Sequence, residues 1–484
     1  MSVWSAVIVP AEGRLPLFQR LAGAIADAIR NGRLAPGSRL PGSRTLAKTL
    51  GVHRNTVLAA LGELAAQGWI TTTRARGTFV AEDLPERRVR PVRAGIAPLG
   101  LALPSGLEPL VRPLPPPARG ELLLDGGVGD PRLAPVDLLG RAWRRVLRRR
   151  GTGLLGYGPA EGLPELRAAL AQMIAGLRGV PATAEHVLVT RGSQMGLDLC
   201  ARALVRPGDV VAIEALGYPP AWDAFRLAGA KLAPIRVDAG GLDVERLAEV
   251  HARTPLRAVY VTPHHQYPTT VTMAAPRRLA LLAWARQERV AILEDDYDHE
   301  FHYDGRPVLP LASADDAGVV IYLGTLSKVL APGLRLGFVV APTAFIERLV
   351  RLRVAMDRQG DHPMEAAVAE LLEDGTIERH IRKLRVEYQA RRDHLVTALR
   401  RDLGDALTVT VPRGGISLWA RLARGIRGLD WVAAAAARGV RVAPGSRYAY
   451  GGRDPRALRL VFSRHTPTEL SRAVAVLKAT RSSL

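Results

Sequence analysis

The sequence is poor in cysteine, lysine and aromatic residues, and it contains no long apolar run. Cys200 is the single cysteine among 484 residues, so no disulfide can form within the chain, which fits a reducing compartment. No apolar stretch reaches the roughly 18 residues that a membrane span requires. The first ten residues lack the basic and apolar regions of a secretory signal. We therefore expect a cytoplasmic protein with no membrane partner.

Acidic residues are also scarce relative to basic ones. The chain carries 67 basic and 46 acidic residues, a formal net charge of +21, and only five of the basic residues are lysines. Residues 1–93 alone hold 14 basic and 6 acidic residues, a net charge of +8. Such an excess predicts either a soluble basic surface or an anionic partner, most often nucleic acid. Charge alone does not decide between the two.

Length and composition predict several folded domains. At roughly 100 to 200 residues per domain, the length suggests two to four of them. An apolar content of 48% with 23% charged residues is ordinary for a folded protein and excludes a disordered chain. Residues 83–120 are rich in proline, which disfavours helix and sheet hydrogen bonding. We predict a linker there, between a domain at 1–82 and a second one at 121–484.

The large C-terminal domain alternates short β-branched runs with helical patterns. This alternation predicts an α/β fold with a mostly parallel sheet covered on both faces. The expected strands are Val187–Thr190, Val210–Glu214, Ala258–Thr262, Val290–Glu294, Val319–Leu323 and Gly337–Val340. The pattern changes near residue 380, where a long helix, Ile381–Leu403, precedes two short strands. We therefore expect a smaller α+β subdomain over about 380–484.

The N-terminal residues carry the pattern of a helix-turn-helix followed by a hairpin. Apolar residues recur at helical spacing in Leu17–Asn31, and two shorter helices, Arg44–Leu50 and His53–Gln67, are separated by Gly51. Ser43 precedes the first of these and could cap it. A strand near Trp69–Thr73, a basic glycine turn and a returning strand complete a "wing". A small helical domain that binds protein is the alternative, but motif and charge together favour DNA.

The run LPGSRTLAKTLGVHRNTVLAALGELAAQGWITTTRARGTFV resembles the winged helix of GntR-type bacterial regulators. In helix-turn-helix proteins the start of the second helix faces base edges, where arginine suits guanine and asparagine suits adenine. The resemblance implies double-stranded DNA as the partner. The residues to which it assigns DNA contacts are Arg44, His53, Arg54, Asn55 and Thr56, with Arg74, Arg76 and Gly77 in the wing.

Lys328 is the first residue to consider in the large domain. It follows the expected strand Val319–Leu323, and ligands of parallel sheets bind beyond the carboxyl ends of the strands. A lysine there is either a solvated side chain or an amine that forms a Schiff base. The strand Val290–Glu294 runs into Asp295 and Tyr297, which alternation places on one face, with Asp296 on the other. Such an acid could pair with the pyridine nitrogen of pyridoxal phosphate (PLP).

A phosphate site is also expected. Strand Val187–Thr190 leads through Gly192 into a helix whose free N–H groups and dipole favour an anion. Ser193 adds a hydroxyl group at this helix start. Thr325, Ser327 and Arg335 can add donors from the lysine loop, and Tyr218 is a candidate for stacking on a ring. Each of these features is common in isolation, so their combination carries the prediction.

The runs YGPAEGLPELR, VTRGSQMGLDL, EALGYPP, ILEDDYDHEF and GTLSKVLAPGLRLGF resemble fold-type I PLP enzymes, the aspartate aminotransferase superfamily. The resemblance implies that Lys328 forms the internal aldimine, that Asp295 binds the pyridine nitrogen and that Tyr297 binds the ring oxygen. Arg459 would bind the carboxylate of an amino-acid ligand. The remaining cofactor residues it implies are Tyr218 for stacking, Ser193, Gln194, Thr325, Ser327 and Arg335 for the phosphate, and Tyr157 for the phosphate of a partner subunit.

One loop departs from that family. Residues 262–270 read TPHHQYPTT, without the asparagine that usually touches the ring oxygen, so the sequence assigns no cofactor role there. His264, His265, His299 and His302 lie near carboxylates, but their spacing matches no zinc pattern. The sequence therefore favours solvated or ring-edge histidines and no metal.

The order of winged helix, proline-rich linker and aminotransferase-like domain resembles the MocR family of bacterial regulators. The resemblance implies a head-to-tail homodimer, in which an amine, an amino acid or PLP itself is sensed through the Lys328 aldimine and alters operator binding. A PLP-dependent aminotransferase with an accessory DNA-binding domain, with Lys328 as catalytic base, is the alternative. A scaffold that binds DNA without a cofactor is a third possibility, against which the retained Lys328, Asp295 and Arg335 argue.

Overall fold

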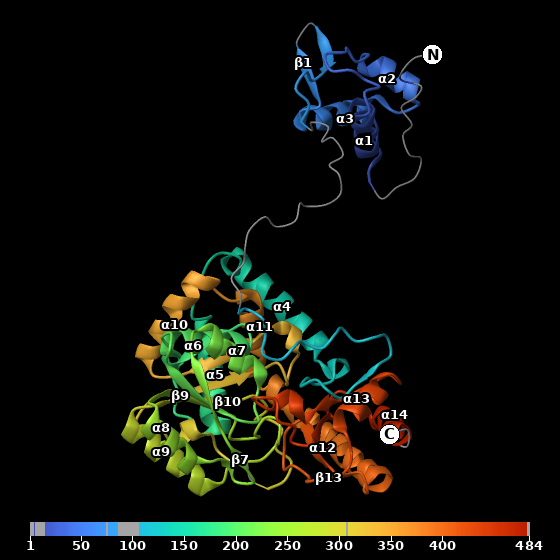
Figure 1. The fold of residues 1–484 in the computed structure, drawn as a ribbon. Coiled ribbons are helices and arrows are strands. Elements are labelled where there is room, and N and C mark those ends of the chain that lie inside the picture. The colour runs from blue at the N-terminus through green and yellow to red at the C-terminus, as the bar shows by residue number, and fades with distance from the viewer. Residues whose placement is uncertain (1–3, 5–14, 74–75, 86–105, 306–307, 482–484) are drawn as a thin grey trace. The chain divides into compact units, whose positions relative to one another are not determined.

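The chain divides into two compact units, residues 1–103 and 104–484 (Figure 1). The computed structural model describes Trp4 and residues 15–73, 76–85, 106–305 and 308–481. Within these ranges no helix is long and apolar enough to cross a bilayer. Each unit has its own buried apolar core.

The N-terminal unit is a winged helix, as predicted. Its elements are α1 (Leu17–Arg30), α2 (Ser43–Leu50), α3 (Arg54–Ala66) and the hairpin β1 (Ile70–Thr73) and β2 (Gly77–Val80). The apolar face of α1, with Leu21 and Ile25 fully buried, packs on α3 through Val57 and Leu64. The expected cap of α2 was wrong. Gly42 is the N-cap, and Ser43 is the first helical residue.

The large unit is built on a seven-stranded sheet of order β4-β12-β11-β10-β9-β5-β6. Only β12 runs antiparallel to its neighbours. The strands are β4 (Val187–Thr190), β12 (Gly337–Val340), β11 (Val320–Thr325), β10 (Ala291–Asp296), β9 (Leu256–Val261), β5 (Val210–Glu214) and β6 (Lys231–Ile235). The sequence predicted six of these and missed β6, an edge strand that contains Pro234. Proline in a strand is tolerated only at such an edge, so the residue pattern hides the strand.

Helices cover both faces of this sheet because its strands alternate apolar side chains between two cores. Leu293 of β10 and Tyr260 of β9 face one core, whereas Ile292 and Val259 face another. The first face is covered by α6 (Ser193–Leu204), α7 (Pro219–Leu227) and α10 (Thr343–Met356). The second face is covered by α4 (Val136–Arg150), α5 (Pro164–Arg178), α8 (Val244–Arg253), α9 (Ala275–Glu288) and α11 (His362–Glu373).

The smaller C-terminal subdomain has the predicted α+β character. The long helix α12 (Thr376–Leu403) begins one turn earlier than expected. It precedes a four-stranded sheet of order β13-β14-β17-β16. The sheet strands are β13 (Leu407–Val409), β14 (Ser417–Leu422), β16 (Ala443–Pro444) and β17 (Ala457–Val461), and the further helices are α13 (Gly428–Ala436) and α14 (Pro467–Arg481).

Two short strand pairs complete the large unit. They are β3 (Leu122–Leu123) with β15 (Val440–Arg441), and β7 (Val237–Asp238) with β8 (Gly241–Leu242).

The described end of the predicted linker lies on the large unit. The main-chain N–H of Leu110 donates to Asp223 Oδ1 at 3.0 Å, and Arg441 Nη1 donates to the carbonyl of Pro115 at 2.6 Å. Residues 86–105 of the predicted linker lie outside the described part of the chain. The segment from Leu110 onward is therefore anchored by hydrogen bonds to side chains of the large unit.

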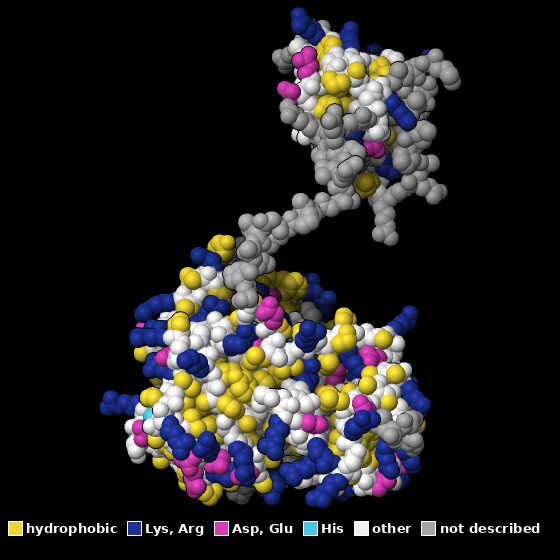
Figure 2. All heavy atoms as spheres, viewed as in Figure 1, with side chains coloured by type: hydrophobic (Ala, Val, Ile, Leu, Met, Phe, Trp, Pro, Cys, Tyr) yellow, Lys and Arg dark blue, Asp and Glu magenta, His cyan; other side chains and the backbone are white. Residues whose placement is uncertain are grey.

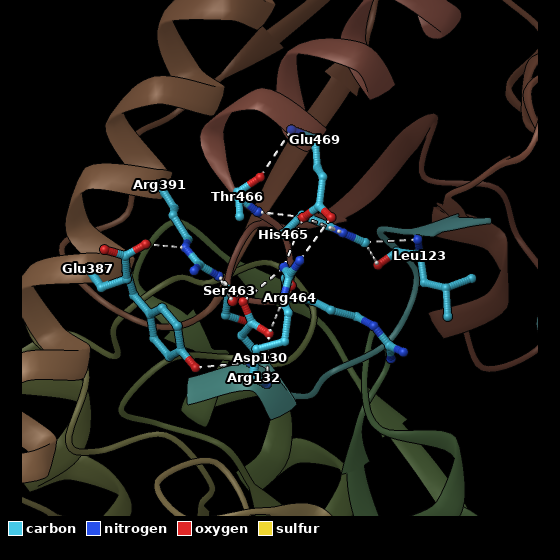
Figure 3. Close-up of polar contacts among 11 residues, drawn as sticks. Leu123, Asp130, Arg132, Glu387, Arg391, Ser463, Arg464, His465, Thr466 and Glu469 are labelled. Carbon is cyan, nitrogen blue, oxygen red and sulfur yellow. Dashed lines mark hydrogen bonds and ion pairs between the residues drawn. The ribbon is translucent and has the colours of Figure 1, made fainter. Parts of the chain in front are cut away.

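A buried ionic network joins the start of the large unit to its C-terminal subdomain (Figure 3). The carboxylate of Asp130 accepts hydrogen bonds from Arg132 Nε at 2.8 Å and from the buried Arg391 Nη1 at 3.0 Å. Burial alone would raise the pKa of Asp130, but the hydrogen bonds from the two arginines outweigh it, so the pKa is lowered. Arg391 also donates to the carbonyl of Ser463, and Arg132 donates to Glu469. Asp130 thus pairs with α12 through Arg391, and the two arginines extend the network to Ser463 and to Glu469 of α14.

Asp130→Ala should destabilise the large unit by about 3 kcal/mol, because it leaves the buried Arg391 without that carboxylate. Denaturant unfolding followed by tryptophan fluorescence would measure the shift. Asp405→Ala is the matched control, since its ion pair with Arg481 is exposed and should contribute almost nothing. Equal midpoints for the two variants would show that the network does not hold the subdomain.

Candidate functional site

A cavity of about 280 Å³ opens at the carboxyl ends of the large sheet, where parallel sheets bind ligands. Nine of the ten predicted cofactor residues, and the predicted effector residue, line it or its rim. From the prediction these are Ser193, Gln194, Tyr218, Asp295, Tyr297, Thr325, Ser327, Lys328, Arg335 and Arg459. The sequence did not indicate the further lining residues Gly127, Val128, Tyr260, Thr262, Tyr267 and Pro332.

Asp295 provides a buried acid at the end of β10. Its Oδ2 accepts a hydrogen bond from Tyr260 Oη at 2.8 Å, whereas its buried Oδ1 has no partner among the described residues. Burial raises the pKa of Asp295 to about 6. Asp296 lies on the opposite face, as strand alternation predicts, and accepts from Tyr322 Oη at 2.7 Å. The cavity therefore presents one unsatisfied carboxylate oxygen that suits a cationic N–H group.

Lys328 follows β11 in the same cavity. Burial, and then the positive charge of Arg459, lower the pKa of its amine to about 8. The loop that carries it is ordered by Thr325, whose hydroxyl contacts Ser327 Oγ at 2.9 Å and accepts from the Ser327 N–H. Because of this lowered pKa, a larger fraction of the Lys328 amine is neutral near pH 7 than for an ordinary lysine, and only the neutral amine can attack an aldehyde.

The start of α6 forms a positive end of the cavity. Gly192 is the N-cap with φ of 75°, and no side chain caps the helix, so its first N–H groups face the cavity unblocked. A Cβ on Gly192 would lie 3.0 Å from Arg335 Nη2. Gly192 thus lets the Arg335 guanidinium pack against the helix start, where Ser193 also lies. This arrangement suits a phosphate group.

Another part of the cavity lining combines an arginine with tyrosines. Arg459 of β17 is fully buried; its Nη1 donates to the carbonyl of Gly126 at 2.6 Å. Its Nε and Nη2 have no hydrogen-bond partner in the described part of the chain. The guanidinium lies 4.6 Å from the Tyr267 ring centroid, and Tyr267 meets Tyr218 edge-on at 5.2 Å. Two unsatisfied donors in this apolar setting suit a carboxylate.

The loop left unassigned by the sequence supports the cavity. Gln266 Nε2 donates to the carbonyl of Leu216 at 2.7 Å, and Thr262 Oγ1 donates to the buried Glu214 at 2.7 Å. Burial raises the pKa of Glu214 to about 7. Tyr297 lines the cavity but donates its hydroxyl to the carbonyl of His265 at 3.0 Å. The loop thereby fixes Tyr267 and Tyr297 together, through contacts that the residue pattern could not reveal.

Tyr157 is the predicted cofactor residue that does not reach this cavity. It lies between α4 and α5 with 80% of its surface exposed. The Arg358 guanidinium lies 4.3 Å from its ring centroid. An exposed tyrosine beside an arginine is free to meet another molecule.

The predicted DNA residues lie together on the N-terminal unit. His53 is the N-cap of α3 and accepts from the Asn55 N–H at 3.3 Å, so it shapes the helix start. Arg44, Arg54 and Asn55 are exposed, and Thr56 is half-buried. Arg54 Nε also donates to Ser43 Oγ at 3.3 Å. This hydrogen bond joins the start of α3 to the start of α2.

The wing turn is only partly described. Arg76 is exposed, Gly77 has a φ of 113°, and the predicted Arg74 lies outside the described residues. A Cβ on Gly77 would lie 3.1 Å from Arg39 Nε, so glycine lets Arg39, which the sequence did not single out, pack beside the wing.

Arginine and lysine side chains on the visible face of the large unit are spread among acidic ones (Figure 2).

Comparison with known proteins defines the class of both units. Residues 124–477 match the family described as aminotransferase class I and II, and residues 17–80 match the bacterial regulatory proteins of the gntR family. The chain therefore joins a GntR-type winged helix to a fold-type I aminotransferase domain. The solved structure of LysN, the α-aminoadipate aminotransferase of Thermus thermophilus, covers 75% of this chain and 93% of its own at 30% identity, with a TM-score of 0.70.

Full-length relatives identify the family. The chain is 31% identical to the probable rhizopine catabolism regulatory protein MocR of Rhizobium meliloti, with 94% of each protein covered. It is 32% identical to the HTH-type transcriptional regulator TauR of Rhodobacter capsulatus, with 96% of each covered. The chain belongs to the MocR family of transcriptional regulators, which confirms the resemblance that the sequence motifs carried.

Covalent uptake of PLP by the cofactor-free protein should depend on pH with a midpoint near 8, where the Lys328 amine loses its proton. The rate should rise with pH, because only the neutral amine attacks an aldehyde. Arg459→Gln removes a nearby positive charge and should move the midpoint upward. Arg421→Gln, at an exposed position in β14, should leave it unchanged. Stopped-flow absorbance would measure the rates, and a midpoint near the ordinary lysine value in the wild type would contradict the assignment.

Proposed function

We propose that this protein is a PLP-dependent regulator that senses a small amino acid in the large unit and changes its affinity for an operator through the winged helix. The observation that carries the proposal is the set of unsatisfied groups in the cavity. Asp295 Oδ1, Arg459 Nε and Arg459 Nη2 are buried and find no partner elsewhere in the described chain. Buried polar atoms of this kind are rare in folded proteins and indicate a missing ligand.

The residues present fit PLP. When bound, PLP supplies an aldehyde that exchanges amines and a ring that withdraws electrons. Lys328 is the amine that would hold it, and Asp295 would accept from the pyridine nitrogen and keep it protonated. Tyr218 would stack on the ring and Tyr297 would lie near the ring oxygen. The phosphate would be held at the start of α6 and by the lysine loop through Ser193, Gln194, Thr325, Ser327 and Arg335.

Arg459 limits the class of effector. Its two free donors suit a carboxylate in a bidentate fork. The cavity would hold the cofactor and the effector together, because Lys328 and Arg459 both belong to its lining. The effector that fits best is therefore an amino acid whose amine reaches the Lys328 end and whose carboxylate reaches Arg459. PLP itself, acting as the effector, would leave the donors of Arg459 unsatisfied.

We also propose a homodimer with the subunits arranged head to tail. Tyr157 is exposed and does not line the cavity of its own chain, which supports a contact with the phosphate site of a second chain. Two winged helices would then read a two-part operator. Arg54 and Asn55 at the start of α3 would contact base edges, and Arg44, Thr56 and Arg76 would contact phosphates. His53 and Gly77 would set the shape of the helix start and the wing. Such a regulator acts in the cytoplasm, where the bacterial chromosome lies.

Aminotransferase turnover is the second candidate, and the lowered pKa of Lys328 favours it. A neutral amine close to a bound amino acid can act as a general base. Repeated conversion of an amino acid to its oxo acid by the purified protein, in excess of one equivalent, would establish it.

Two variants should separate the functions of the two units. Lys328→Ala should remove the visible absorbance band of bound PLP and the response of operator binding to amino acids, while leaving DNA binding intact. Arg54→Ala should keep the PLP band and weaken binding to an operator selected from random DNA by about 1–3 kcal/mol. Lys383→Ala, at an exposed lysine of α12, is the control for both measurements. A colourless wild type after PLP addition, or an unchanged ligand response in Lys328→Ala, would contradict the proposal.

A further inference from the structure

Four histidines gather in the large unit beside the cavity. His264 and His265 come from the loop after β9, and His299 and His302 come from the segment after β10. The ring centroids of His264 lie 4.4 Å from His265, 4.6 Å from His299 and 6.3 Å from His302. All four are at most 9% exposed, so of the two expected environments, solvated or at a ring edge, the solvated one was wrong.

Two of these histidines are unsatisfied. Neither ring nitrogen of His264 or of His302 has a hydrogen-bond partner within the described ranges. The main chain of Asp304 lies near His302 but outside hydrogen-bond geometry. A neutral imidazole carries one donor and one acceptor, and leaving both unpaired in the interior is unfavourable. His264, at 2% exposure, is thus a buried polar side chain that points to a missing partner.

The neighbouring histidine is oriented by a carboxylate. His265 Nδ1 lies 2.8 Å from Asp298 Oδ1, which directs its Nε2 away from that carboxylate. Histidines that bind metal ions usually donate their second ring nitrogen to a carboxylate in this way. His299 Nδ1 makes the same contact with Asp296 Oδ2 at 2.8 Å. The carboxylates of Asp298 and Asp296 therefore lie beside the histidines that could bind a cation.

The ligand atoms are spaced for a metal ion. One nitrogen from each of His264, His265 and His302 lies within 4.8 Å of the other two. Three atoms at that spacing lie about 2.8 Å from a common centre, whereas zinc–nitrogen bonds are about 2.0–2.1 Å long. Each imidazole therefore needs to move by less than about 1 Å to bind a zinc ion at that centre. An overlapping set, His264, Asp296 and His299, has the same spacing. In this second set His299 Nδ1 already contacts Asp296 Oδ2, although Asp296 Oδ1 has no partner among the described residues. The first set is favoured because both ring nitrogens of His264 and of His302 lack a partner there.

We propose that His264, His265 and His302 bind a divalent transition-metal ion of the zinc class, with Asp298 as the carboxylate that positions His265. Three neutral imidazoles are ligands for zinc, cobalt and nickel, whereas magnesium and calcium prefer oxygen. The site does not depend on PLP or on an amino-acid effector.

A metal ion at this site would connect the loop after β9 to the C-terminal subdomain. The site lies under a loop of the C-terminal subdomain, because His302 forms a β-bridge with Gly414. A Cβ on Gly414 would lie 2.5 Å from His265 Nε2, so only glycine at 414 leaves that nitrogen accessible. The same His265 accepts the Tyr297 hydroxyl on its main chain. A metal ion here would fasten the loop beneath the cavity to the subdomain that carries Arg459.

The test uses the untagged full-length protein, stripped with a chelator and titrated with Co²⁺ and then Zn²⁺. The wild type should bind one ion per chain, show the intense visible bands of tetrahedral cobalt, and release the cobalt when zinc is added. His302→Gln and His264→Gln should each weaken binding by more than 100-fold. Asp298→Asn should weaken it by about 10- to 100-fold, as expected for the carboxylate partner of a ligand. His394→Ala, at a histidine that contacts Ser471 instead, is the matched control.

Thermal unfolding provides an independent readout. Zinc should raise the unfolding midpoint of the wild type and of His394→Ala, and it should not raise the midpoint of His302→Gln, provided that each protein unfolds cooperatively without metal. Absence of stoichiometric binding in the wild type, or binding of equal strength in His302→Gln and His264→Gln, would overturn the proposal. Because the readouts are cobalt absorbance and unfolding, failure here leaves the PLP and operator proposals untouched.

Discussion

The buried carboxylate of Asp295 is the constraint on which the rest of the large unit depends. A carboxylate with one unpaired oxygen at the end of a central strand is unfavourable unless a cationic group completes it. The chain supplies Tyr260 on one side and leaves the other side open to the cavity. Lys328 lies in the same cavity, where burial and then the positive charge of Arg459 lower the pKa of its amine. Several buried polar groups of the cavity thus have no hydrogen-bond partner within the described chain. A ligand with a pyridinium, a phosphate and a carboxylate would provide partners for them.

The cavity is shared between the sheet and the C-terminal subdomain, so its occupancy can be transmitted through contacts already present. Residues 126–130 form the connection. The carbonyl of Gly126 accepts from Arg459, and the carbonyl of Val128 accepts from Ser463. Asp130 binds Arg391 of the long helix α12 (Figure 3). A ligand that pulls on Arg459 acts directly on this segment. A two-state shift of the subdomain would then be the element that ligand and DNA both bias, which is the physical requirement for allosteric coupling.

The sequence patterns predicted the secondary structure well because each one depends on residues that are close together in the chain. Helix periodicity, strand alternation and glycine turns predicted both units and six of the strands of the large sheet. The resemblance to fold-type I PLP enzymes supplied the predicted cofactor residues, nine of which line the cavity. Edge strand β6 was missed because proline replaces its hydrogen-bond donor. Tyr260, Tyr267 and the histidine cluster were missed for a different reason. Tyr260 of β9 meets Asp295 of the neighbouring strand β10, and the other residues lie in the loops after these two strands. Such contacts join residues about 30 positions apart and carry no local signature. The sequence favoured solvated or ring-edge histidines, and the fold buries all four.

Thermodynamic linkage between the two units tests the account most directly. The affinity of the full-length protein for a selected operator is measured with and without PLP plus the amino acid that perturbs its spectrum most. The affinity for that amino acid is then measured with and without operator. The account predicts that the amino acid changes the operator affinity by the same factor by which the operator changes the amino-acid affinity, and that this factor differs clearly from one. If neither ligand changes the affinity for the other, in a protein that binds both, the account is contradicted and the chain carries two independent binding units.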